Sequence, residues 1–140
     1  MATIYTAEAL STGAGRNGNV RSSEGLLDLA LAVPKEMGGS GAGVNPELLF
    51  AAGYAACFHS ALQAVARSQK VQIEDSSVGG RVQIGPNGEG GFQLAVLLEV
   101  VLPGLEHDQA QALADAAHQV CPYSNATRGN IEVTITVTED

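Results

Sequence analysis

The sequence predicts a single α+β domain over residues 1–140, built on a mainly antiparallel sheet. Three observations support this fold class. An apolar segment from Asn45 to Lys70 has the length and start signal of a helix, a second helical pattern covers 106–120, and apolar residues elsewhere alternate as in strands. The predicted order, β-β-β-α-β-β-α-β, lacks the regular strand–helix alternation of parallel α/β folds.

Three short strands joined by turns are predicted at the start of the chain, at residues 2–10, 20–23 and 27–33, followed by a glycine-rich loop at 34–43. Gly13, Gly15 and Gly18 spell G-x-G-x-x-G. A dinucleotide site needs a helix directly after such a loop, whereas the polar segment that follows here is strand-like. We therefore predict a hairpin loop that presents Arg16, and the plainer alternative is a solvated loop charge.

The central helix is predicted to begin at Asn45-Pro46-Glu47. Asn45 can cap the helix, Pro46 suits its first position, and Glu47 places a negative charge in the first turn. The residues from Leu48 to Phe58 are almost all apolar, and polar residues return after His59. A helix that is apolar all round is buried on all sides, so we expect the first half, with Cys57, in the core and the second half to reach the surface.

The second half of the chain is predicted to form a hairpin, a helix and a last strand. The hairpin strands cover 71–84, with a bend at Gly79-Gly80, and 92–102. The helix at 106–120 should stop at Cys121, because Pro122 disfavours helical backbone in the residue before it. Residues 131–137 alternate between apolar and polar, which indicates a half-buried strand.

The composition excludes several classes of partner. The net charge of −8 argues against nucleic acid and anionic membranes. Polar residues interrupt the best candidate for a membrane span, and the N-terminus lacks the pattern of a signal peptide, so we expect a cytoplasmic protein. His59, His107 and His118 show no dense ligand spacing with the cysteines, which predicts no metal site. We expect ordinary structural roles for the histidines, and a Cys–His nucleophile pair formed with another part of the fold stays open as the alternative.

The two cysteines, 64 residues apart, are the remaining candidates for chemistry. In a reducing compartment such thiols are free, catalytic or redox-active more often than a structural disulfide, and composition alone favours two buried, inert thiols. An apolar setting raises a thiol pKa, and Cys57 lies about three turns from the helix start, beyond much help from the helix dipole. A reactive Cys57 therefore needs a cation, and Arg16 is the most suggestive of the seven Lys and Arg residues.

Several segments resemble the organic hydroperoxide resistance proteins of the OsmC/Ohr superfamily. The matching segments span nearly the whole chain, and those around the two cysteines are long and specific: Tyr5-Thr6-Ala7-Glu8-Ala9, Gly15-Arg16-Asn17-Gly18, Asn45-Pro46-Glu47, the stretch from Phe50 to Leu62 (FAAGYAACFHSAL), and the stretch from Val120 to Asn130 (VCPYSNATRGN).

This resemblance implies an OsmC-like fold in an intertwined homodimer, and a Cys-based peroxidase for organic hydroperoxides that uses no metal, haem or other bound cofactor. Cys57 would be the peroxidatic residue and Cys121 the resolving residue, linked by a disulfide during the cycle. Arg16 would hold the thiolate and the peroxide, and Glu47 would pair with Arg16. The implied reductant is a dithiol, typically the lipoyl group of a lipoylated protein.

One distance conflicts with the simplest version of this site. Glu47 and Cys57 lie ten residues apart, or about 15 Å along a straight helix, so one guanidinium cannot easily touch both. Either the helix breaks near Gly53, or Arg16 and Glu47 reach the thiol across a dimer. Other functions also remain open: an apolar-ligand carrier for fatty acids, an OsmC-type stress protein with little turnover, and a structural dimer with spectator thiols.

Overall fold

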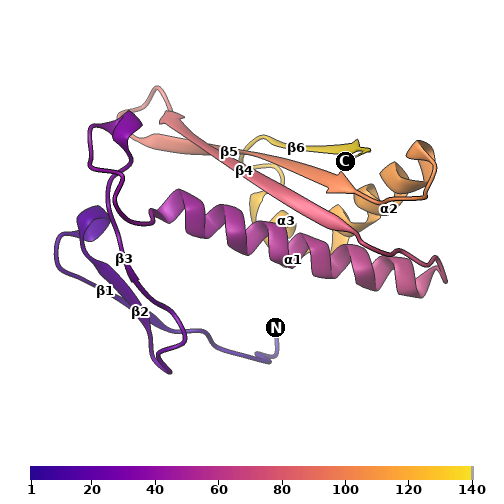
Figure 1. Cartoon of the computed structure of the whole chain (residues 1–140), viewed down its shortest axis with the longest axis horizontal. Helices are drawn as coiled ribbons and strands as arrows, with labels where there is room; N and C mark the ends of the chain where they lie inside the picture. Colours follow the sequence, from indigo (N-terminus) through magenta and orange to yellow (C-terminus); the bar gives the residue numbers. More distant parts are fainter. Residues whose placement is uncertain (140) are drawn as a thin grey trace. The chain divides into compact units, whose positions relative to one another are not determined.

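The computed structural model describes residues 1–139, and its elements are those of an α+β protein, as predicted (Figure 1). The chain divides into two compact units, Met1–Leu49 and Phe50–Asp140. The single domain over residues 1–140 stays a prediction. The strand and helix order matches the predicted one, with one additional short helix and two single-turn 3-10 helices.

The first unit is a small antiparallel sheet in the order β1-β2-β3, formed by β1 (Ala9–Thr12), β2 (Asn19–Ser22) and β3 (Asp28–Ala30). The first strand begins at Ala9, later than predicted. The glycine-rich loop is a hairpin loop, as predicted, and carries the 3-10 turn η1 (Gly15–Asn17); a second such turn, η2, covers Lys35–Met37. A side chain on Gly18 would overlap the Thr12 carbonyl oxygen, which explains the glycine there.

Helix α1 (Pro46–Ser68) begins as predicted, because the N–H of Leu48 donates a 2.9 Å hydrogen bond to Asn45 Oδ1. It runs without a break through Gly53. The expected all-round burial of its first half is wrong for the single chain, where Leu48 is 54% exposed and Ala52 and Ala56 are also exposed. The buried side chains of α1 are Tyr54, Phe58, Ala61, Leu62, Val65 and Ala66.

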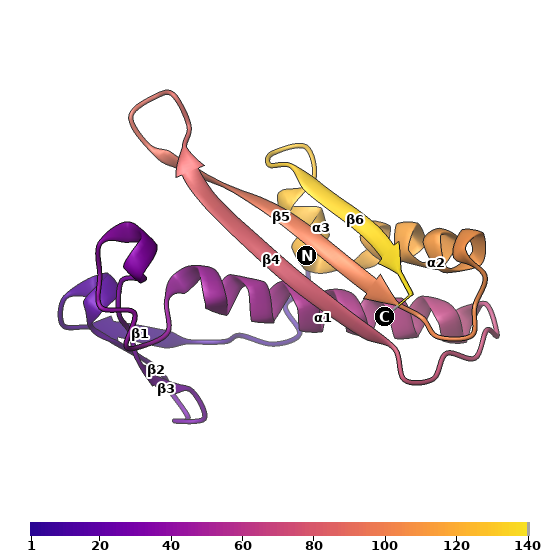
Figure 2. The ribbon, with the colours of Figure 1, turned by 45° about the horizontal axis from the view of Figure 1, so that its top comes forward.

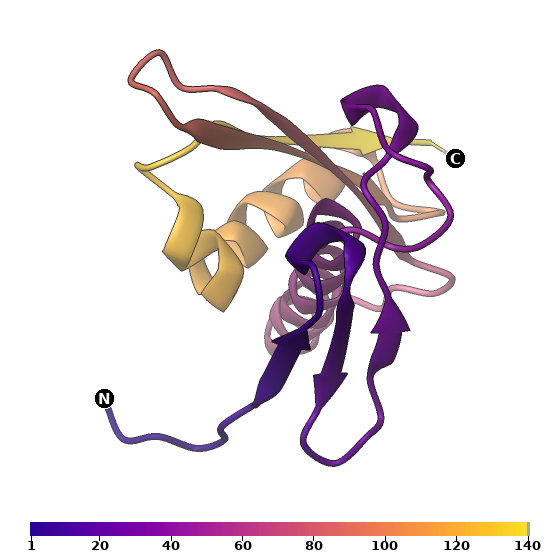
Figure 3. The ribbon, with the colours of Figure 1, turned by 90° about the vertical axis from the view of Figure 1, so that its left-hand side faces the viewer.

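The second unit holds a sheet in the order β4-β5-β6 with the helices on one face (Figures 2 and 3). β4 (Ser77–Pro86) and β5 (Phe92–Val101) form the predicted antiparallel hairpin, whereas β6 (Val133–Thr138) pairs with β5 in parallel. The predicted second helix is α2 (His107–Val120). Helix α3 (Pro122–Thr127), which follows α2 directly, was not predicted.

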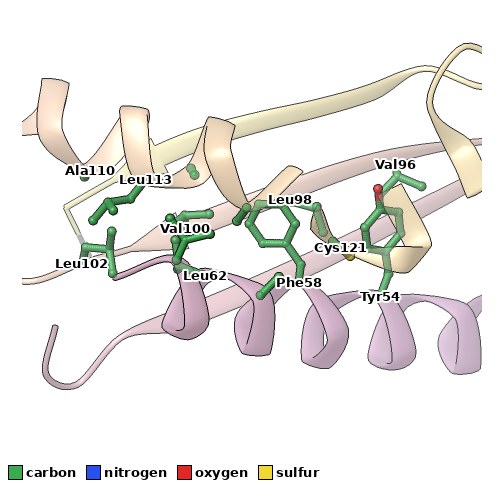
Figure 4. Close-up of a cluster of buried hydrophobic side chains, with 14 residues drawn as sticks. Tyr54, Phe58, Leu62, Val96, Leu98, Val100, Leu102, Ala110, Leu113 and Cys121 are labelled. Carbon is green, nitrogen blue, oxygen red and sulfur yellow. The ribbon is translucent and has the colours of Figure 1, made fainter. Parts of the chain in front are cut away.

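The core of the second unit lies between its sheet and its helices (Figure 4). Val96, Leu98 and Val100 alternate along β5 and are almost completely buried, as a strand with one covered face requires. Phe58 and Leu62 meet them from α1. The small side chains of Ala110, Ala114 and Ala117, together with Leu113, form the buried face of α2.

Gly80 marks a close approach of β4 to α1 and not the predicted bend, since β4 is continuous from Ser77 to Pro86. A Cβ atom on Gly80 would lie 2.9 Å from the carbonyl oxygen of Ala51. The glycine therefore allows the strand backbone to pack directly on the helix. The residues before Ser77, predicted as part of this strand, are irregular.

By length and composition, α1 is also the one described helix that could cross a membrane. A core helix passes the same test, and α1 supplies Tyr54, Phe58 and Leu62 to the core described above. The absence of a membrane partner stays a prediction.

Candidate active site

Cys121 lies at the corner between two helices. It ends α2, as predicted from Pro122, and it also begins α3. Its backbone is extended (φ −63°, ψ 123°), the conformation that a following proline imposes. The side chain is fully buried, and it is held within the core cluster of the second unit. The corner thus places the Cys121 thiol in the core of the second unit.

Cys57 faces this corner from α1. The Cys121 thiol donates to Cys57 Sγ across 3.7 Å, and both cysteines are free. Cys57 is half-buried, so it is the more accessible of the two. A disulfide has an S–S distance of about 2.05 Å, so a small approach of the two sulfurs would close the bond. The structure therefore brings together the two cysteines that the sequence singled out.

Burial raises the pKa of the Cys57 thiol. The backbone N–H of Tyr123 acts in the opposite direction and lowers this pKa, while the neighbouring Cys121 raises it again. The second unit by itself therefore favours the neutral thiol, which is the unreactive form. Reactivity at neutral pH needs a nearby positive charge, and the lowering of the Cys57 pKa by Arg16 stays a prediction.

Three aromatic rings, two on α1 and one on α3, pack against one another in the second unit. The ring centroids of Phe50 and Tyr54 lie 6.1 Å apart, and Tyr123 lies 6.1 Å from Phe50 and 5.6 Å from Tyr54. Tyr123 sits on Gly53, where an added Cβ would lie 2.8 Å from the tyrosine hydroxyl. Phe50 and Tyr123 also line a cavity of about 890 Å³ within the second unit, together with Phe92, Leu94, Ala126 and Ile131.

Arg16 and Glu47 form a forked ion pair in the first unit, which is the pairing that the family resemblance implied. Arg16 Nη1 donates to Glu47 Oε2 at 2.9 Å, and Nη2 donates to Oε1 at 2.6 Å. The hydrogen bond from Arg16 holds the pKa of Glu47 below its ordinary value. The arginine side chain is 37% exposed and the glutamate 14% exposed, so water still reaches the guanidinium.

A chain of buried hydroxyl groups beside the cysteines was missed by the sequence reasoning. It joins Tyr54, Ser124 and Thr127, and it ends at His118, for which an ordinary structural role was expected. The sequence contained one usable signal, since His118 and Ser124 lie three residues before and after Cys121.

Within residues 1–139, no group of three or more His, Cys, Asp or Glu side chains is arranged to hold a metal ion. The groups at this site that can do chemistry are the two thiols, with the aromatic rings and the hydroxyl chain beside them.

Comparison with known proteins supports the resemblance seen in the sequence. The profile of the OsmC-like protein family matches residues 38–136. An organic hydroperoxide resistance protein from Xanthomonas axonopodis pv. citri is 51% identical over 141 residues, which cover 96% of this chain and 94% of that protein.

Two solved structures show the same fold. An organic hydroperoxide resistance protein from Legionella pneumophila matches with a TM-score of 0.94 and 50% identity, covering 98% of this chain and 99% of that one. OhrB of Bacillus subtilis matches with a TM-score of 0.86 and 43% identity, covering 96% and 98%. The chain belongs to the OsmC-like protein family, and its fold is that of the organic hydroperoxide resistance proteins.

Proposed function

We propose that this protein is a thiol peroxidase that reduces organic hydroperoxides to alcohols. The observation that carries the proposal is the pair of free thiols, Cys57 and Cys121, whose sulfurs lie 3.7 Å apart with the second one fully buried. The names of its relatives, which are organic hydroperoxide resistance proteins, support the substrate class.

The reaction balances with the two thiols alone. The Cys57 thiolate attacks the outer oxygen of the hydroperoxide, the O–O bond breaks, and the alkoxide leaves as an alcohol after taking up a proton. Cys57 is then a sulfenic acid. Cys121 attacks this sulfur, water leaves, and a disulfide forms. An external dithiol returns both cysteines to thiols by exchange, which supplies the two electrons that the peroxide consumed.

The positive charge that Cys57 needs is proposed to come from Arg16 of the partner subunit. Helix α1 is unbroken from Pro46 to Ser68, so a helix break near Gly53 no longer explains how Arg16 meets both Glu47 and Cys57. The ten residues between Glu47 and Cys57 span about 15 Å of helix axis. A homodimer in which the Arg16–Glu47 pair of one subunit serves the thiol of the other removes this conflict.

The surface of a single chain supports the homodimer. Only 17% of the most apolar part of α1 is buried in the chain, and Leu48, Ala52 and Ala56 are exposed along it. The first unit also exposes Ile4 and Leu10. Apolar area of this kind gains about 25 cal/mol per Å² when it is covered. A second copy of the chain would cover it without any further partner.

The remaining expectations complete the proposal. The protein works in the cytoplasm without a bound metal, haem or organic cofactor and without nucleic acid or membrane partners, consistent with its net charge of −8. Lipoyl groups of a lipoylated protein are the proposed source of the dithiol, which follows from the family resemblance.

A second candidate function is the binding of fatty acids without turnover. The 890 Å³ cavity favours it, because Phe50, Phe92 and Tyr123 offer apolar contacts to an alkyl chain, while polar residues such as Asn87 and Glu89 also line it. In the peroxidase proposal the same cavity receives the tail of the hydroperoxide, and each buried methylene adds about 0.8 kcal/mol of binding.

Peroxide consumption separates the two functions. With dihydrolipoamide as reductant, the parent protein should consume cumene hydroperoxide with a much higher kcat/KM than hydrogen peroxide, which has no apolar group to bury. Cys57→Ser should abolish consumption. A carrier would bind fatty acids equally well before and after this substitution and would consume neither peroxide. Equal efficiencies for the two peroxides would contradict the role of the cavity.

A further inference from the structure

Beside the two cysteines, three hydroxyl groups and one imidazole form a continuous hydrogen-bonded chain. His118 Nδ1 lies 2.8 Å from Ser124 Oγ, which lies 2.8 Å from the Tyr54 hydroxyl. The Tyr54 hydroxyl lies 3.1 Å from Thr127 Oγ1, whose hydroxyl donates to the carbonyl oxygen of Ser124 at 3.3 Å. Tyr54 and Ser124 are fully buried and Thr127 is 6% exposed, so water does not compete for the bonds among the three hydroxyl groups, whereas His118 is half-buried.

The chain is built around the cysteines in sequence as well as in space. Tyr54 lies three residues before Cys57 on α1, and His118 and Ser124 lie three residues before and after Cys121. Tyr54 and Cys57 are three residues apart on α1 and therefore share a face of that helix. The hydrogen bonds between Tyr54 and α3 tie the helix that carries Cys57 to the corner that carries Cys121.

Counting protons fixes the direction of the chain. It contains four hydrogen bonds but only three hydroxyl protons, and its last acceptor is a carbonyl oxygen, which cannot donate. For all four hydrogen bonds to form together, the fourth proton has to come from His118 Nδ1. Each group then donates once, in the order His118, Ser124, Tyr54, Thr127. His118 thus carries a proton on Nδ1 in both its neutral and its charged form.

Burial lowers the pKa of His118, and the nearby charge of Arg128 lowers it further. The ring is therefore kept neutral to lower pH than an ordinary histidine. Arg128 also donates from Nη1 to the His118 carbonyl oxygen at 2.8 Å and bonds Asn125 Oδ1, which joins the end of α2 to α3 on the exposed side of the corner. The Arg128 bonds stay within α2 and α3, whereas the hydroxyl chain connects these helices to α1 through Tyr54.

We propose that Tyr54, Ser124 and His118 are positioning residues for disulfide formation: their hydrogen bonds hold Cys121 against Cys57 so that the disulfide closes before the sulfenic acid is oxidised further. The inference rests on the proposed peroxidase function and deepens it. Closing the bond shortens the sulfur–sulfur distance from 3.7 Å to about 2.05 Å. A corner that drifted from α1 would lengthen the life of the sulfenic acid, which excess peroxide converts irreversibly to sulfinic acid.

The test compares the two steps in one experiment. Tyr54→Phe keeps the ring and removes two links of the chain, and Ser124→Ala removes its centre. In a single turnover with cumene hydroperoxide, both variants should oxidise Cys57 within about three-fold of the parent rate. Disulfide closure should slow by ten-fold or more, with more sulfenic acid trapped by dimedone and more sulfinic acid at high peroxide. Unchanged closure in both variants would overturn the proposal.

A matched control is available on the same helix. His59 Nε2 lies 2.8 Å from Ser76 Oγ, an equally short histidine–serine bond two residues from Cys57, but it leads to the segment before β4. Ser76→Ala should leave closure at the parent rate. If it slows closure as much as Ser124→Ala does, the effect is general loosening of α1, and the positioning role is wrong.

A second arm needs no peroxide and separates this inference from the proposed function. Oxidised glutathione forms a mixed disulfide with Cys57, and Cys121 then displaces glutathione thiolate as the internal disulfide forms. Tyr54→Phe should slow this displacement about as much as it slows closure after peroxide. If the parent protein consumes no peroxide but Tyr54→Phe still slows the displacement, the proposed peroxidase function is wrong and the positioning role stands. If the displacement in Tyr54→Phe runs at the parent rate, the positioning role alone is wrong.

The proton order has its own readout. Nitrogen chemical shifts of the His118 ring should show the Nδ1–H tautomer at neutral pH in the reduced parent, although free histidine favours Nε2–H. In Tyr54→Phe the Ser124 hydroxyl loses the Tyr54 oxygen as its acceptor and can donate to His118 Nδ1 instead. The preference of the His118 ring for Nδ1–H should therefore weaken. An Nε2–H tautomer in the parent would contradict the chain as described. Thr127→Ser and Thr127→Val, which keep and remove the last hydroxyl, give the same comparison if Tyr54→Phe does not fold.

Discussion

The two units of the molecule hold different groups of the proposed active site. The first unit carries the charges, in the partly exposed Arg16–Glu47 pair, and Leu31 and Ala32 are its only buried apolar residues among those described. The second unit carries the thiols and the hydroxyl chain within a continuous core. The Arg16–Glu47 pair thus lies in a unit with few buried apolar residues, and the two thiols lie in a unit with a continuous core.

This difference has an energetic meaning. An ion pair open to water contributes about 0.2–1 kcal/mol, so it can form and break at little cost. A buried hydroxyl that loses its partner costs about 1–3 kcal/mol, so the hydroxyl chain resists rearrangement. We infer that the distance between the sulfurs is set by the second unit and the charge state of Cys57 by the first, and that the two can be changed separately.

The largest expected effect concerns the second unit alone. Peroxide-treated protein should contain a disulfide between Cys57 and Cys121 of the same chain as its main oxidised product, because these sulfurs already lie 3.7 Å apart. Peptide mapping detects the linked pair, and Cys121→Ser should remove it and leave Cys57 as sulfenic and sulfinic acid. A predominance of links between subunits would show that the second unit does not set this geometry.

The packing of β4 on α1 is the next target. Gly80→Ala places a Cβ 2.9 Å from the Ala51 carbonyl oxygen, a backbone atom that cannot rotate away. Overpacking of this kind typically costs about 1–3 kcal/mol, so we expect a lower unfolding midpoint in urea. Gly79→Ala is the matched control, because its Cβ would meet its nearest neighbour, Glu99 Cβ, at 3.9 Å. If Gly80→Ala and Gly79→Ala unfold at the same urea concentration, the close approach of β4 to α1 does not explain the glycine at position 80.

The features that the sequence predicted correctly are those that depend on neighbouring residues, and the features that it missed depend on residues far apart in the chain. Local signals were sufficient for the Asn45 cap, the hairpin loop around Arg16 and the end of α2 before Pro122. The hydroxyl chain joins residues 70 and 73 positions apart, and no local pattern says which buried hydroxyl meets which. Gly80 suggested a bend for the same reason, since its partner is the backbone of a distant helix.

The exposed first half of α1 shows a different limit of sequence reasoning. Its apolar residues predicted burial on every side, whereas only 17% of the most apolar part of the helix is buried in the single chain. Helix α3 was missed because it has only six residues and lacks an apolar pattern. Its two buried side chains, Ser124 and Thr127, are polar.

The smallest expected effect concerns the ion pair. The pKa of Glu47 is lowered by Arg16, so the contribution of the pair is complete above the ordinary glutamate pKa and is lost as the pH falls through the lowered value. Thermal unfolding of the parent and Glu47→Gln should therefore differ by about 0.2–1 kcal/mol near pH 7 and converge in acid. Glu99→Gln, which removes the more exposed Arg81–Glu99 pair, should change stability less. If the difference in stability between the parent and Glu47→Gln grows as the pH falls, the Arg16–Glu47 pair is not its cause.

The most direct test of the central claim is the pH dependence of Cys57 alkylation, measured in a Cys121→Ser background so that one thiol reacts. If Arg16 sets the charge of Cys57, Arg16→Ala should raise the midpoint of alkylation by about one to three pH units, and Arg16→Lys should recover only part of this shift because it lacks the planar fork. The same pH profile for the parent and Arg16→Ala, with organic peroxide still reduced at the parent rate, would show that Arg16 is a bystander and contradict the division between charge and geometry.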